Sequence, residues 1–128
     1  MDADKLTLRS QAALDGAHQQ AVARSHQTIE PEHLLLALLS DPEGIVIPVL
    51  HGVGVAPAPL RDRVVAALDR LPKVYAPGAE VRVGPALASA LDAAFGEAEA
   101  LGDEYVSTEH LLLGLSAGVT EAARILRD

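Results

Sequence analysis

Thr28–Leu38 (TIEPEHLLLAL) is repeated later in the chain as Tyr105–Leu115 (YVSTEHLLLGL). The offset is 77 residues (105 − 28), and six of the eleven positions are identical. Leucine runs resemble one another readily, but here a Glu-His pair precedes the run both times. Upstream, the small and apolar residues at 12, 14, 17 and 21 have counterparts at 89, 91, 94 and 98, at the same offset. We interpret this pattern as a duplicated helical unit.

The duplication predicts an all-α fold with no significant sheet, in which two helical repeats are related by a pseudo-twofold axis. Repeat 1 spans residues 6–71 and repeat 2 spans residues 85–128, with residues 72–84 as a linker rich in Pro and Gly. Repeat 1 has about four helices. Repeat 2 lacks its last helix, so we interpret the chain as a fragment of a longer protein.

Capping residues and apolar spacing place the individual helices. Helices are predicted over about 8–24, 31–39, 45–51, 60–71 and 85–101, over the second leucine run after Ser107, and from the cap Thr120 through Leu126. Thr7 and Ser107 are expected N-caps, and Pro31 and Pro85 suit first helical positions. We expect Leu101 on the apolar face of its helix. Residues 80–83 alternate but are too few to predict a strand.

Composition restricts the function classes. The chain has 128 residues, a formal charge of −8 and no cysteine. The negative charge argues against nucleic-acid binding, which needs clustered Lys and Arg. No apolar run is long enough to span a membrane, and the N-terminus lacks the pattern of a signal peptide. The lack of cysteine fits a cytoplasmic location.

The five histidines do not form a metal or catalytic pattern. His33 and His110 are expected to pack or cap at helix starts, whereas His18, His26 and His51 are expected to be exposed or in turns. No Ser, Thr or Cys nucleophile stands beside a His and a carboxylate, and no phosphate-binding glycine motif is present. We therefore expect no catalytic, metal or cofactor site in this domain.

With these chemical sites excluded, the remaining hypothesis is that the domain acts by binding other molecules at its surface. Two apolar leucine helices, paired across a pseudo-twofold axis, leave room for a groove between the repeats that binds peptides by apolar contact and a few polar anchors. A helical core without any binding face is the alternative, and the pattern leaves it open.

The repeated stretches resemble the N-terminal domain of the Clp ATPases, a double repeat of four helices per copy. The resemblance covers nearly the whole chain and rests on residues 31–38, residues 108–115 and the turn Gly52–Val55. Residues 67–74 (ALDRLPKV) are most similar to the ClpB disaggregase branch.

The resemblance implies a substrate-recognition domain of an ATP-dependent disaggregase or unfoldase that binds unfolded or aggregated polypeptide. It implies a cytoplasmic homohexamer working with a partner chaperone system, with ATP and Mg²⁺ bound by modules outside this chain. The isolated domain is expected to be a non-catalytic monomer.

The resemblance also assigns candidate substrate-binding residues. Thr7, Asp103 and Glu109 match polar positions of the ClpB domain. The positions that line the apolar groove with leucine in the family are occupied in this chain by Leu91, Ala93, Glu97 and His110. Only Leu91 keeps its leucine, so the groove is expected to be shallower, unless Phe95 and Leu101 compensate.

A ClpC-like domain, which binds phosphorylated arginine or an adaptor for a Clp protease, is the alternative. Thr7 and Glu32 match such a pocket in repeat 1. In repeat 2 Glu109 remains, but Gly84 replaces the hydroxyl residue.

Overall fold

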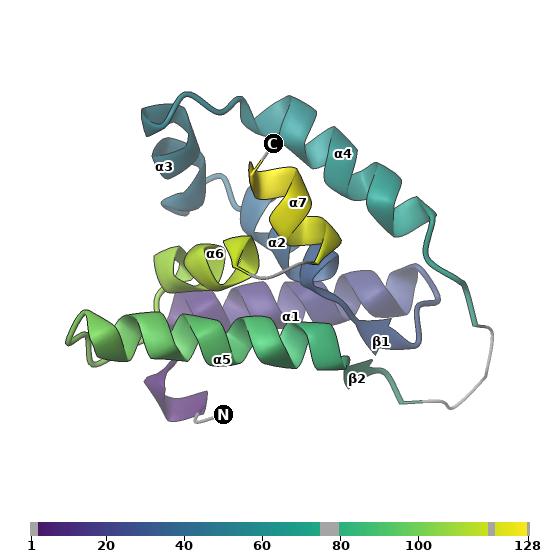
Figure 1. The fold of residues 1–128 in the computed structure, drawn as a ribbon. Helices are drawn as coiled ribbons and strands as arrows, with labels where there is room; N and C mark the ends of the chain where they lie inside the picture. Colours follow the sequence, from purple (N-terminus) through teal and green to yellow (C-terminus); the bar gives the residue numbers. More distant parts are fainter. Residues whose placement is uncertain (1–2, 75–79, 118–119, 128) are drawn as a thin grey trace.

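The computed structural model describes residues 3–74, 80–117 and 120–127 (Figure 1). A short 3-10 helix, Ala3–Lys5, precedes the repeats. Repeat 1 contains four α-helices, which are α1 (Leu8–Ala23), α2 (Pro31–Leu39), α3 (Val46–Gly52) and α4 (Pro57–Asp69). The described part of repeat 2 contains α5 (Pro85–Ala100), α6 (Thr108–Ser116) and α7 (Glu121–Arg127). The predicted all-α fold and its helix order are confirmed.

The 77-residue offset holds in three dimensions. Helix α5 begins and ends 77 residues after α1, and α6 does the same relative to α2. The segments in front of these helices pair across the repeats in parallel. Val83 pairs with Ile29, and 77 positions away Leu6 pairs with Val106. Each repeat therefore gives and receives the same contact, which is the exchange that an approximate twofold axis requires.

The exchange also produces a small sheet that was not predicted. β1 (Thr28–Ile29) and β2 (Arg82–Val83) form two parallel strands. The alternation over residues 80–83 is too short to predict a strand by itself. Its partner, β1, is distant in the sequence, so no local signal indicates the pairing. Residues 75–79 of the predicted linker lie outside the described residues.

The leucine helices form the centre of the core, although α2 is buried more completely than α6. Helix α2 packs most extensively on α1 and α6 on α5, while α2 also contacts α4, α7 and α6. All residues of α2 except Ala37 are buried. In α6, Leu111 and Leu115 are buried but Leu113 is 46% exposed.

Small residues let the first two helices of each repeat approach closely. In repeat 1 a Cβ added at Gly16 would lie 3.4 Å from Ala37 Cβ. In repeat 2 the glycine is on the other helix. A Cβ at Gly114 would meet the carbonyl oxygen of Ala90 and lie 2.8 Å from the backbone nitrogen of Ala94. The α5–α6 contact is therefore the tighter of the two.

Candidate functional site

Each repeat builds the same turn after its first helix. Ser25 and Gly102, 77 positions apart, both have positive φ, at 58° and 73°. The backbone N–H of His26 donates to the carbonyl of Ala21, and that of Asp103 donates to Ala98, both at 2.9 Å. This left-handed ending satisfies the last helix carbonyls in both repeats. It places His26 and Asp103 at equivalent points, directly before the segments that lead into α2 and α6.

The histidine of each Glu-His pair caps its own helix. The backbone N–H of Glu30 donates to His33 Nδ1 at 2.8 Å, and that of Ser107 donates to His110 Nδ1 at 2.9 Å. Because Nδ1 accepts in both cases, Nε2 carries the proton of the neutral ring. The prediction that these histidines cap or pack at helix starts is confirmed.

In repeat 2 the capping histidine is hydrogen-bonded to a carboxylate. His110 Nε2 and Asp103 Oδ2 are 2.9 Å apart, and the Asp103 side chain is 50% exposed. Glu109, exposed in the first turn of α6, lies 3.5 Å from the hydroxyl of Ser107. A carboxylate there faces the positive end of the helix dipole.

In repeat 1 the capping histidine contacts a second histidine. His33 Nε2 and His26 Nδ1 are 2.7 Å apart, and both rings are buried. Nε2 of His26 has no hydrogen-bond partner among the described residues. Burial lowers the pKa of His33 to about 4, with smaller contributions from His26 and Arg24. His26 was predicted to be exposed or in a turn. It does lie at the turn after α1, but its ring is buried, because the turn directs it inward onto His33.

The repeat-2 turn borders an open hollow of about 500 Å³. Three apolar side chains on its wall are largely exposed, namely Leu101 (63%), Tyr105 (53%) and Leu113 (46%). The remaining lining residues are polar or charged: Thr7, Asp103, Glu104, Ser107, Glu109 and His110. The structure thus brings together three predicted site residues, Thr7, Asp103 and Glu109. We call this hollow the repeat-2 site.

Thr7 reaches the repeat-2 site because the neighbouring Leu6 pairs with Val106 of the second repeat. Its N–H donates to the carbonyl of Val106 at 3.1 Å. Its hydroxyl accepts from the N–H of Ser10 at 3.1 Å, which confirms Thr7 as the N-cap of α1. Ser10, fully buried, donates in turn to Val106 O at 2.9 Å.

Of the other candidate residues, Phe95 and Leu91 lie outside the repeat-2 site, whereas Leu101 lines it. Phe95 is half-buried and lines a neighbouring hollow, which shares Asp103 and Glu104 with the repeat-2 site. Leu91 is buried in the core with 2% exposure and presents almost no surface. Leu101 was expected on the buried face of α5, but it caps the helix end and points to solvent.

Glu32 is not among the residues that line the repeat-2 site with Thr7. It is buried in the first turn of α2, and burial raises the pKa of its carboxyl, opposed by backbone hydrogen bonds from its own amide and from Ala122. The predicted pairing of Thr7 with Glu32 was wrong, because the cross-repeat strand contact carries Thr7 to Glu109 instead.

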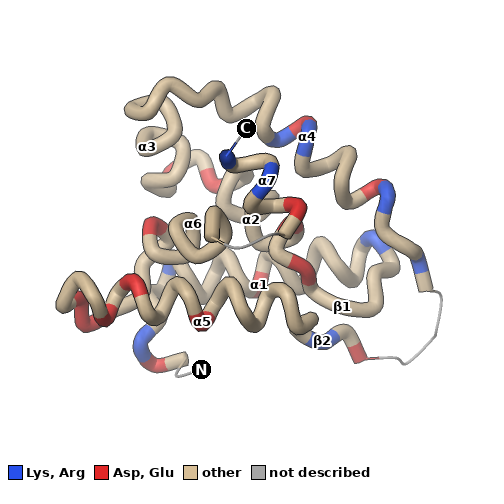
Figure 2. The backbone as a smooth tube through the Cα atoms, viewed as in Figure 1, with Lys and Arg blue, Asp and Glu red and all other residues tan. Residues whose placement is uncertain are grey.

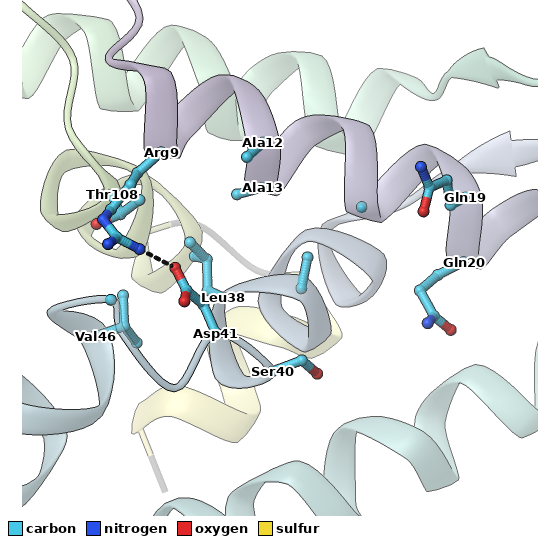
Figure 3. Close-up of a pocket in the computed structure, with 13 residues that line it drawn as sticks. Arg9, Ala12, Ala13, Gln19, Gln20, Leu38, Ser40, Asp41, Val46 and Thr108 are labelled. Atoms are coloured by element: carbon cyan, nitrogen blue, oxygen red, sulfur yellow. Dashed lines mark hydrogen bonds and ion pairs between the residues drawn. The ribbon is translucent and has the colours of Figure 1, made fainter.

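A second hollow, of about 370 Å³, runs along α1 beside the loop after α2 (Figure 3). Its floor is made of small residues such as Ala13 and Gly16, and Gln20 stands at one end. At the other end Arg9 pairs with Asp41 at 2.9 Å. The ion pair neutralises the guanidinium charge there, so this hollow offers shape rather than a charged anchor.

Among the described residues, no cluster of His, Asp or Glu has the arrangement of a metal site. The helices that the structure describes include none long and apolar enough to cross a membrane.

Four residues of the repeat-2 site were not predicted as site residues, namely Glu104, Tyr105, Ser107 and Leu113. The signal for Glu104, Tyr105 and Ser107 is the 77-residue offset, extended from the leucine helices to the turns in front of them. Leu113 lies within α6, and nothing in the leucine run marks it as exposed.

Comparison with known proteins identifies relatives of the whole chain. Residues 5–128 match the model of the Clp repeat (R) N-terminal domain. The chaperone protein ClpB of Mycobacterium tuberculosis (strain ATCC 25618 / H37Rv) is 40% identical over 126 residues, which is 98% of this chain and 15% of that protein. The chain therefore spans about one seventh of the length of that relative.

Solved structures share the fold. The Hsp104 N-terminal domain from Candida albicans superposes with a TM-score of 0.81 at 20% identity, covering 96% of this chain and 78% of that one. A ClpV N-domain in complex with a VipB peptide gives a TM-score of 0.73 at 24% identity, covering 94% and 71%.

Proposed function

The chain belongs to the Clp repeat (R) N-terminal domain family, and we propose that it binds exposed segments of unfolded or aggregated polypeptide for a chaperone ATPase of the Clp type. The observation that carries the proposal is the composition of the repeat-2 site, where exposed apolar side chains surround a group of carboxylates.

The apolar wall suits a chain that has lost its fold. Leu101, Tyr105 and Leu113 are exposed by about half or more, and burying each against a partner contributes roughly 1–2 kcal/mol. Unfolded polypeptides differ from folded ones chiefly in exposing apolar side chains. A site of this size gives weak, reversible contact, as an initial contact with substrate requires.

The charged groups of the repeat-2 site supply orientation. Asp103, Glu104 and Glu109 all line it, and no Lys or Arg is among its lining residues. Figure 2 shows Asp and Glu residues gathered at the end of α5 and in the turn after it. Such a surface attracts cationic segments and repels acidic ones.

Phosphoarginine binding, the alternative, has one supporting observation. Thr7 and Glu109 line the same hollow, so a hydroxyl and a carboxylate are available together. A phosphate there would also face the carboxylates of Asp103 and Glu104, with no cation lining the site. Unmodified polypeptide is the better match to this charge distribution.

The activity of the whole protein is also a proposal. The chain covers 15% of its ClpB relative, so ATP and Mg²⁺ would be bound by modules outside it. We propose a homohexameric, cytoplasmic ATPase working with a partner chaperone system, in which this domain is non-catalytic. The peptide seen on a ClpV N-domain supports a peptide-binding role for this fold.

Binding of a permanently unfolded protein, fluorescently labelled, to the 128-residue chain tests the proposal by anisotropy. The double variant Asp103→Asn/Glu109→Gln should bind about tenfold more weakly, since each lost charge contact is worth roughly 0.5–1 kcal/mol. The control is Asp15→Asn/Asp62→Asn, which removes two exposed carboxylates that do not line the site. Equal affinity of the two double variants would reject the placement.

A further inference from the structure

The repeat-1 counterpart of the site already has a segment of the chain lying on it. After α4, the chain continues through Leu71–Val74 and passes the turn between α1 and β1 (Figure 1). Leu71 is half-buried against the core. The backbone N–H of Val74 donates to the carbonyl of Ser25 at 2.8 Å. Ser25 is the left-handed residue of the repeat-1 turn, so the linker is attached at the centre of that turn.

The place that the linker occupies is equivalent to the repeat-2 site. A small hollow under the linker is lined by His26, Gln27, Thr28 and Glu30 on one side and by Leu71, Pro72 and Val74 on the other. The first four residues correspond, at the 77-residue offset, to Asp103, Glu104, Tyr105 and Ser107, which all line the repeat-2 site. Repeat 1 therefore shows how an extended chain lies on this kind of turn.

Repeat 2 has the same turn, and no segment among residues 3–74, 80–117 and 120–127 is hydrogen-bonded across it as Val74 is across the repeat-1 turn. Gly102 is the counterpart of Ser25, and no donor within the described residues reaches its carbonyl oxygen. Asp103 is half exposed, whereas His26 at the equivalent position is 4% exposed. The carbonyl and the carboxylate are thus both open to a partner.

Charge indicates what kind of segment fits. Burial lowers the pKa of His26, and the positive charges of Arg24 and Lys73 lower it further. Lys73 itself is exposed and lies between Pro72 and Val74, which line the hollow over His26. In repeat 2 the residue equivalent to His26 is Asp103, and Glu104 lies beside it. A segment lying on repeat 2 as Leu71–Val74 lies on repeat 1 would therefore pass beside carboxylates with no lining Lys or Arg to balance them, which favours a cationic side chain in that segment.

We propose that the repeat-2 site binds an extended polypeptide segment in which a Lys or Arg is flanked by aliphatic residues, in the way that Leu71–Val74 lies on repeat 1. A backbone N–H of the segment donates to the carbonyl of Gly102, its cationic side chain pairs with Asp103, and its aliphatic side chains cover Tyr105 and Leu101. The inference rests on the proposed function and names the class of segment and its mode of binding.

The chain's own linker sequence supplies the probe. A capped peptide Arg-Leu-Pro-Lys-Val, which reproduces residues 70–74, is titrated into the ¹⁵N-labelled 128-residue chain. We expect amide shifts at Gly102–Tyr105 and Glu109–Leu113. A second peptide with Glu in place of Lys should bind at least tenfold more weakly. In Asp103→Asn the difference between the two peptides should fall to less than threefold.

The outcomes separate the two proposals. If unfolded protein shifts the repeat-2 residues but the Lys peptide does not at 10 mM, the binding mode is wrong and the proposed function stands. The same holds if the Lys and Glu peptides bind equally. If neither ligand shifts these residues, both proposals fail.

Discussion

The two repeats share one backbone design but place opposite chemistry on it. In both, a left-handed turn leads to a residue that contacts the helix-capping histidine. In repeat 1 that residue is His26, buried and beneath a linker, whereas in repeat 2 it is Asp103, half exposed at the edge of an open hollow. Duplication thus preserved the hydrogen-bonded frame, while exposure and charge diverged. The open, acidic repeat is the one that we assign to polypeptide binding.

The largest expected difference between the repeats is in the effect of a glycine substitution on stability, at the close α5–α6 contact and at its counterpart α1–α2. Gly114→Ala should lower the free energy of unfolding by about 3 kcal/mol, because its Cβ meets backbone atoms of α5 that cannot move aside. Gly16→Ala, on the α1–α2 contact of repeat 1, is the matched control. Its Cβ meets only Ala37 Cβ at 3.4 Å, and alanine favours the helix, so the change should stay within about 1 kcal/mol. Urea denaturation measures both, and equal losses would contradict the difference in packing.

The buried histidine pair should make repeat 1 sensitive to acid. The pKa of His33 is about 4 in the folded state and 6.5 in the reference state. Below pH 6.5 the unfolded chain therefore binds a proton that the folded chain does not, so stability falls as the pH falls toward 4. The expected loss is about 2–3 kcal/mol, measured as the urea midpoint at several pH values.

The variant His26→Asp gives repeat 1 the pair that repeat 2 has. A carboxylate beside His33 favours its protonated form, so the acid-induced loss between pH 6.5 and 4.5 should shrink. Glu32 has the opposite effect, since its raised pKa adds stability on acidification, and it is present in both proteins. An unchanged pH profile would show that the histidine pair does not control acid stability.

Removing the hydroxyl cap of α1 is expected to have a smaller effect on stability. Thr7→Ala should cost about 1 kcal/mol, because the N–H of Ser10 loses its acceptor. Thr7→Ser retains the hydroxyl and should remain within about 0.5 kcal/mol of the wild-type protein. Thermal unfolding compares the two variants. Indistinguishable melting temperatures would mean that the cap contributes nothing measurable.

The sequence predicts the helices well because their signals are local. Thr7 and Pro31 mark helix starts, the leucine run marks the core, and the 77-residue offset predicts the duplication. Such local signals do not predict the contacts between the repeats. Nothing near Thr28 or Arg82 indicates that they pair, since the partners are more than 50 residues apart. The equivalent pairing of Leu6 with Val106 decides which carboxylate Thr7 approaches.

The site was predicted in part for the same reason. Thr7, Asp103 and Glu109 came from a family resemblance and the structure brings them together, but their role in binding stays a prediction. The burial of His26 was missed because its position in a turn after a helix is typical of exposed residues. Only the contact with His33, seven residues later, holds it inside.

The most direct test of the central claim is an amide NMR titration of the 128-residue chain with unfolded protein, in which each residue is compared with its counterpart 77 positions away. Our account predicts shifts for Gly102, Asp103, Tyr105 and Glu109, and little change for Ser25, His26, Thr28 and Glu32. Equal shifts in both sets, or shifts confined to the first, would contradict the assignment of polypeptide binding to repeat 2.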